Sequence, residues 1–294
     1  MQQQPEHLER SDQVATYAQM SAMVERCRTA LAARGLIAKP QSALGALFAK
    51  ADRLSRQWAE GSVSEDLSGL MESDQAYLIA EAVLAAVDDP EAREAIRRVT
   101  KSELRLQRRD PSQGKDALWE LSLAALFKAR GVPAVFKEPD LEVDLGTPFG
   151  GYGIACKKVY SLNSVEKQFS KGLKQLSPYN GAGLLAFNLD DQIPERSVLT
   201  SRTKAKAADI LYRRNMSFIQ MHMRQFSDAV MAGRCDGVWV STSAHGVLSE
   251  VLPSFNRVRQ STLWTVEGAG VSTRMRIEVV RQLLVDDAEG EQRS

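Results

Sequence analysis

Acidic residues alternate along one short stretch of the chain, Glu138-Pro-Asp-Leu-Glu-Val-Asp-Leu. Successive side chains of a β-strand point to opposite faces, so Asp140, Glu142 and Asp144 would share one face. Carboxylates that converge in this way repel each other, and a bound divalent cation relieves the repulsion. Exposure to solvent relieves it as well, so the spacing alone leaves both interpretations open.

A lysine follows in the next predicted strand, Gly153-Ile-Ala-Cys-Lys-Lys-Val. Across an antiparallel hairpin, the face that carries Ala155 and Lys157 can lie against one of the aspartates. An acid and a lysine beside a metal suit phosphodiester hydrolysis, because the metal binds the phosphate and lowers the pKa of an attacking water. The lysine then stabilises the charge that grows on the phosphate oxygens or orients the water. The alternative is a surface lysine whose stem packs on apolar groups.

Glu120 lies in a predicted helix in which apolar residues surround nearly the whole circumference. A buried carboxylate costs free energy unless a cation or hydrogen bonds compensate its charge. Glu120 is therefore a candidate for the same chemistry. The alternative is a structural glutamate that is hydrogen-bonded to backbone or lies at a partly exposed edge.

The elements that would position these residues follow a helical first part of the chain. Apolar residues recur at three-to-four spacing up to about residue 110, which predicts helices. Turn residues at 110–114 indicate a domain boundary. Beyond them we expect helices at about 115–130, 164–176 and 203–231, and strands at 132–137, 141–145, 152–159, 183–189, 237–241, 263–266 and 275–280. The sequence thus predicts a helical domain at 1–110, an α/β domain with a mixed (α+β) sheet at 111–285, and a disordered acidic tail at 286–294.

This ordered set resembles the core of the PD-(D/E)XK nuclease superfamily, which runs α-β-β-β-α-β. The residues that carry the resemblance are Pro139-Asp140, the strand end Ile154-Ala-Cys-Lys-Lys, and Gln175-Leu176 at the end of the following helix. They cover roughly residues 113 to 190. The resemblance implies a restriction-endonuclease-like core, with Asp140 or Asp144 and Lys157 as catalytic residues and Gln175 in a supporting role.

One position departs from the pattern of the superfamily. Its usual acid two residues before the lysine is replaced by Ala155. The resemblance implies that Glu120 supplies the missing ligand, so that Glu120, Asp140 and Asp144 would be the candidates for binding Mg²⁺ or Mn²⁺. The predicted function is a metal-dependent endo- or exonuclease that hydrolyses DNA, with antiviral defence as the biological role that the superfamily suggests. The alternative is a catalytically degenerate module that binds nucleic acid or partner proteins.

The charge and the cysteine content limit which partners and which cellular compartment we expect for this protein. The formal net charge of +1 over 294 residues gives no overall attraction to nucleic acid, so such a signal must be local. Candidate nucleic-acid contacts are Lys158, Lys171, Lys174, Arg213 and Arg214. Three unpaired cysteines, no apolar run of membrane-spanning length and a polar start predict a cytoplasmic protein without a membrane partner. We expect the N-terminal helices to mediate dimerisation or contact with a protein partner.

Overall fold

The computed structural model describes residues 8–10, 17–62, 67–106, 108–195 and 197–285. The chain divides into two compact units. The helical unit comprises Gln13–Ala125 with Pro194–Ser197, and the sheet unit comprises Met1–Asp12, Leu126–Ile193 and Val198–Ser294. The division falls inside a helix at 125/126, whereas the turn residues had placed the boundary near 110. The tail at 286–294 lies outside the described residues.

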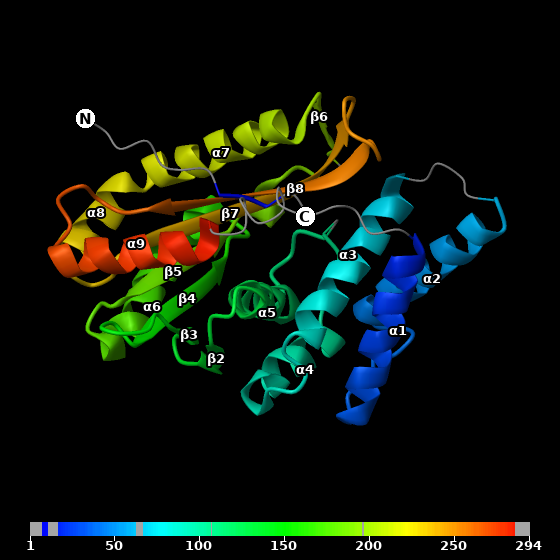
Figure 1. Ribbon diagram of the computed structural model, residues 1–294, viewed down its shortest axis with the longest axis horizontal. Coiled ribbons are helices and arrows are strands. Elements are labelled where there is room, and N and C mark those ends of the chain that lie inside the picture. Colours follow the sequence, from blue (N-terminus) through cyan, green and yellow to red (C-terminus); the bar gives the residue numbers. More distant parts are fainter. Residues whose placement is uncertain (1–7, 11–16, 63–66, 107, 196, 286–294) are drawn as a thin grey trace. The chain divides into compact units, whose positions relative to one another are not determined.

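The helices of the helical unit pack around buried apolar side chains. Its elements are α1 (Tyr17–Ala33), α2 (Ala43–Ala59), α3 (Leu67–Leu84), α4 (Arg93–Lys101) and most of α5 (Gln113–Ala129) (Figure 1). Val24, Phe48, Ile79 and Ile96 are fully or almost fully buried in it. These helices precede the sheet in the chain, as the apolar spacing of the sequence predicted.

Arginines of the helical unit are held by glutamates of the same unit. Arg97 pairs with Glu94, and Arg105 pairs with Glu103. Glu103 also accepts hydrogen bonds from the backbone amides of Leu104 (3.1 Å) and Arg105 (3.0 Å). These contacts, the Arg105 side chain first, lower the pKa of Glu103 from 4.5 to about 2. The arginine-rich segment is thus largely neutralised within its own unit.

This depressed pKa predicts an acid-dependent loss of stability. A carboxylate whose folded-state pKa lies below its unfolded value stabilises the fold above about pH 4.5, and the contribution is lost as the pH falls toward 2. We expect Glu103→Gln to lower the free energy of unfolding at pH 7, and the deficit relative to the parent to shrink between pH 4.5 and 2. Urea unfolding of both proteins across this range measures it. A deficit that does not change with pH would contradict the assignment.

Among the described residues, eight strands form one mixed sheet in the sheet unit. Seven of them run in the order β1-β8-β7-β5-β4-β3-β2, and β6 pairs with β7. Strands β4, β5 and β7 are mutually parallel, whereas β2, β3 and β4 form an antiparallel meander. The strands are β1 (Leu8–Arg10), β2 (Ala134–Lys137), β3 (Asp140–Asp144), β4 (Gly151–Lys158), β5 (Gly183–Asn188), β6 (Leu199–Ser201), β7 (Gly237–Leu248) and β8 (Phe255–Trp264).

Helices cover both faces of this sheet. One face carries Ala155, Leu185 and Phe187 and packs against α6 (Val165–Leu176), α7 (Lys204–Met221) and α8 (Met223–Met231). On the other face, Trp239 of β7 makes an edge contact with Phe127, with ring centroids 5.9 Å apart. Helix α9 (Val271–Val285) also lies on that face, and Figure 1 shows α7 and α9 flanking β7 and β8.

A buried asparagine joins α7 to the two longest strands. The Asn215 amide donates to the backbone oxygens of Val240 (3.2 Å) and Gln260 (3.0 Å) and to the Thr262 hydroxyl (3.2 Å). Its carbonyl oxygen accepts from the Thr242 hydroxyl at 2.6 Å. Because a buried polar group is costly unless its hydrogen bonds are made, this network fixes how α7 lies on β7 and β8.

Three predictions of secondary structure are wrong. Residues 275–280 are part of α9, not a strand: their apolar residues alternate, but the buried ones are Ile277, Val280 and Leu284, which have helical spacing. The helix expected at 203–231 is broken at His222, whose backbone leaves the helical region at φ −111° and ψ 10°. Leu8–Arg10, expected to be helical, pairs with β8. None of the described helices has the length and apolarity needed to cross a bilayer.

Candidate active site

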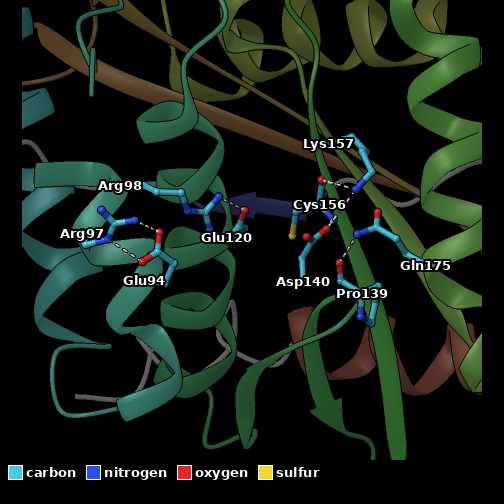
Figure 2. Close-up of polar contacts among 9 residues, drawn as sticks. All are labelled: Glu94, Arg97, Arg98, Glu120, Pro139, Asp140, Cys156, Lys157 and Gln175. Carbon is cyan, nitrogen blue, oxygen red and sulfur yellow. Dashed lines mark hydrogen bonds and ion pairs between the residues drawn. The ribbon is translucent and has the colours of Figure 1, made fainter. Parts of the chain in front are cut away.

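Asp140 and Lys157 meet on adjacent strands of the sheet unit. The Lys157 Nζ lies 3.1 Å from the Asp140 Oδ2 and donates a hydrogen bond to the Cys156 carbonyl oxygen at 2.8 Å (Figure 2). The Cys156 backbone amide donates to the same Asp140 Oδ2 at 2.7 Å. One carboxylate oxygen and one backbone oxygen therefore converge on a single cationic point.

The register of the hairpin explains this meeting. Leu141 pairs with Ile154 in the antiparallel β3–β4 ladder. Asp140 consequently lies beside Ala155, and side chains that are directly opposite point to the same face. Lys157 shares that face because it is two residues beyond Ala155. The site thus forms at the first residue of β3 and near the end of β4, which is antiparallel to β3 and parallel to β5.

Helix α6 covers the site and holds the start of β3. The Gln175 amide donates to the Pro139 carbonyl oxygen at 2.7 Å, one residue before Asp140 (Figure 2). The Tyr179 hydroxyl, just beyond α6, contacts the Glu138 carbonyl oxygen (2.8 Å) and the Glu142 carboxylate (2.6 Å). Residues on both sides of Asp140 are therefore fixed. Tyr179 was missed in the sequence, because it lies beyond the end of α6 and its contacts have no local signal.

Burial dominates the electrostatics of the pair. The side chains of Lys157 and Asp140 are 10% and 20% exposed. Desolvation raises the pKa of Asp140, and the Lys157 ammonium and the Cys156 amide oppose that rise without cancelling it. A carboxylate in this position is incompletely compensated, so an additional cation beside it would be stabilised.

The other two acids of the strand do not join the pair. Glu142 binds Lys137 (2.9 Å) as well as Tyr179. Asp144 is exposed, pairs in register with Gly151, and accepts a hydrogen bond from the Gly146 amide at 2.9 Å. It lies roughly 13 Å along the strand from Asp140, at about 3.3 Å per residue. Of the two aspartates, Asp140 is therefore the one that the structure brings to Lys157.

Glu120 belongs to the helical unit and has a strong partner there. Its carboxylate accepts from the Arg98 guanidinium, with an Oε2–Nη2 distance of 2.7 Å and an Oε1–Nη1 distance of 3.3 Å (Figure 2). The structural interpretation of this buried glutamate thus has a specific basis. Its predicted role as the ligand that replaces the acid at Ala155 stays a prediction.

Of the predicted nucleic-acid contacts, two are exposed and have no side-chain partner among the described residues, and three are engaged by the protein. Lys171 and Lys174 lie on the exposed side of α6. Arg213 pairs with Asp209, and Arg214 donates to the Gln192 carbonyl oxygen at 2.7 Å.

Lys158 requires a correction, because it points into the interior. Its Nζ lies 2.8 Å from the Asp191 carboxylate and donates to the Asn188 side chain at 2.6 Å. The side chains of Lys158 and Asp191 are 5% and 0% exposed. Lys158 follows Lys157 directly and must point to the opposite face of the strand, so it is not available to a phosphate in this arrangement.

The oxygens around Lys157 fit a weakly held divalent cation. Mg²⁺ often binds through one or two carboxylates and keeps several waters. Asp140 offers one carboxylate and Cys156 one carbonyl oxygen, and the buried Gln175 Oε1 has no hydrogen-bond partner within the described part of the chain. Over the ranges that the structure describes, no group of three or more His, Cys, Asp or Glu side chains could hold a metal. Any such site would thus depend on backbone oxygen, water and substrate.

Comparison of the sequence with protein-family models, with curated proteins and with solved structures found no match.

Proposed function

We propose that this protein is a divalent-metal-dependent nuclease that hydrolyses phosphodiester bonds in DNA, built on a restriction-endonuclease-like core. The observation that carries the proposal is the convergence of the Asp140 carboxylate, the Cys156 carbonyl oxygen and the Lys157 ammonium on one point. The element order α5-β2-β3-β4-α6-β5 supports it, because it is the order that the resemblance implies.

Each residue of the site has a role in this chemistry. Lys157 would contact an oxygen of the scissile phosphate, where a fixed positive charge stabilises the transition state more than the ground state. Asp140 and the Cys156 carbonyl oxygen would hold the metal ion, which binds the phosphate and lowers the pKa of the attacking water. Gln175 acts as a positioning residue, because it fixes the Pro139 carbonyl next to Asp140.

A second function has its own supporting observation. Ala155 is fully buried in an apolar cluster, and the Asp140 carboxylate already has an ion-pair partner in the Lys157 ammonium. A protein with this arrangement could bind nucleic acid, or a protein partner, without cleaving it. Both functions share the fold and differ in catalysis.

A cleavage assay separates the two. The purified protein is incubated with supercoiled plasmid, linear duplex and single-stranded DNA, and with RNA, in Mg²⁺, in Mn²⁺ and in EDTA. Metal-dependent cleavage that is lost in Asp140→Asn supports the nuclease. Glu142→Gln is the matched control on the same strand face, and it should retain cleavage. Binding without cleavage in either metal would support the degenerate module.

A further inference from the structure

Three lysines form a ridge along the exposed side of α6. Lys167, Lys171 and Lys174 are spaced at i, i+4 and i+7, which places them on one side of the helix. All three are exposed, whereas the opposite side of α6 packs into the core through Val165, Phe169, Leu173 and Leu176. Glu166 is the only acid in the helix. We call these three residues the α6 lysine ridge.

The side chains of the ridge have no ion-pair or hydrogen-bond partner among the residues that the structure describes. Several basic residues elsewhere are engaged: Arg97 by Glu94, Arg98 by Glu120 and Arg213 by Asp209. A row of unpaired like charges on one helix face is unfavourable by itself. An anion with several charges would remove that repulsion, which points to a polyanionic ligand.

The ridge stands on the helix that covers the Asp140–Lys157 pair. A Cβ atom at Gly172, next to Lys171, would lie 3.4 Å from the Lys157 Cε. The last turn of the same helix carries Gln175, which holds Pro139 beside Asp140. Gly172 is buried against the sheet and the ridge is exposed, so a chain of phosphates bound along the ridge would lie on the outer side of the helix whose inner side contacts Lys157.

We propose that the α6 lysine ridge binds successive phosphates of one nucleic-acid strand and so holds that strand on the helix that covers Lys157. This inference rests on the proposed function. At 1.5 Å rise per residue, Lys167 and Lys174 are about 10 Å apart along the helix. That distance is about three steps of the 3.4 Å spacing at which the phosphates of one strand follow each other along the axis of a duplex. The ridge, not the arginines of α7, is then the principal binding surface.

The test compares two variants with equal loss of charge. One is Lys167→Gln/Lys171→Gln/Lys174→Gln. The control is Lys206→Gln/Arg224→Gln/Arg234→Gln, which removes three exposed positive charges from α7, from α8 and from the turn after α8 in the same unit. Fluorescence anisotropy measures binding of labelled single-stranded and duplex DNA in EDTA as a function of salt, and circular dichroism checks folding of both variants.

We expect the ridge variant to lose about 2 to 3 units of the slope of log affinity against log salt, at 0.7 to 0.9 per phosphate. The control should keep the parent slope. Equal changes in the two variants, or a ridge variant that binds like the parent, would overturn the inference. So would a parent protein that binds an acidic protein but no nucleic acid.

The outcomes also separate this inference from the proposed function. If the ridge variant has a reduced slope but the parent protein does not cleave DNA with Mg²⁺ or Mn²⁺, the binding role of the ridge is supported and the nuclease function is contradicted. If the parent protein cleaves DNA but the ridge variant binds normally, the nuclease function is supported and the binding role of the ridge is contradicted.

Discussion

Lys157→Ala is expected to slow DNA cleavage by about a hundred- to a thousand-fold, the usual effect of removing one preorganised group that stabilises transition-state charge. Affinity for DNA should change little, because the lysine acts more on the transition state than on the ground state. The 10% exposure of its side chain also leaves it a small part of any binding surface. Single-turnover cleavage and binding in EDTA measure the two effects separately.

Lys157→Met is the control for packing in this experiment. It keeps an unbranched side chain beside Gly172 but removes the charge, so it should be as inactive as the alanine variant. Both changes leave the Asp140 carboxylate without its ammonium partner, which should raise the pKa of Asp140 further. Cleavage by either variant at the parent rate would show that Lys157 is not a catalytic residue, whether or not the fold is that of a nuclease.

Ala155→Glu should strongly destabilise the protein, and the stability of this variant should increase when a divalent metal is added. Ala155 is fully buried beside Leu185 in the apolar cluster under α6. A larger, charged side chain there should cost on the order of 3 kcal/mol or more through overpacking and desolvation. The new carboxylate would also stand beside Asp140 and repel it. If the two acids bind Mg²⁺ or Mn²⁺, stability should return by about 2.7 kcal/mol at a hundred times the dissociation constant.

Thermal unfolding with and without metal measures this response. Ala155→Gln is the matched control, because it adds nearly the same volume and polarity without the charge. It should be destabilised and should gain nothing from metal. A glutamate variant whose melting temperature is the same in Mn²⁺ and EDTA would show that Asp140 and position 155 do not share a cation site.

The hairpin illustrates how far the sequence can predict the site. Alternation alone placed Asp140, Asp144 and Lys157 on shared faces, because the period of a strand is two residues. It could not choose between the aspartates, since that choice depends on the pairing register. The pairing of Leu141 with Ile154 depends on both strands together, so the sequence of either strand alone does not indicate it. The same register places Asp144 at the other end of the hairpin.

Burial was the quantity that the sequence predicted least well. Lys158 appeared to be an ordinary basic residue, and its interior position depends on Asn188 and Asp191, about thirty residues later. Glu120 was correctly expected to be a buried carboxylate, but its partner Arg98 lies on another helix. Long-range pairs of this kind follow from tertiary packing, so neither periodicity nor spacing in one segment can indicate them.

The buried pair of Lys158 and Asp191 has a consequence for which lysine faces Asp140. Two consecutive lysines on one strand are chemically interchangeable, and a slip of β4 by one residue would exchange their faces. The slip would bring Lys158 to Asp140 and break its ion pair with the buried Asp191 carboxylate, at a cost in free energy. The ion pair on the far face of β4 thus specifies the alignment of the strand. The contacts that hold Lys158 are to Asp191 and Asn188, and they act on the site through the alignment of β4.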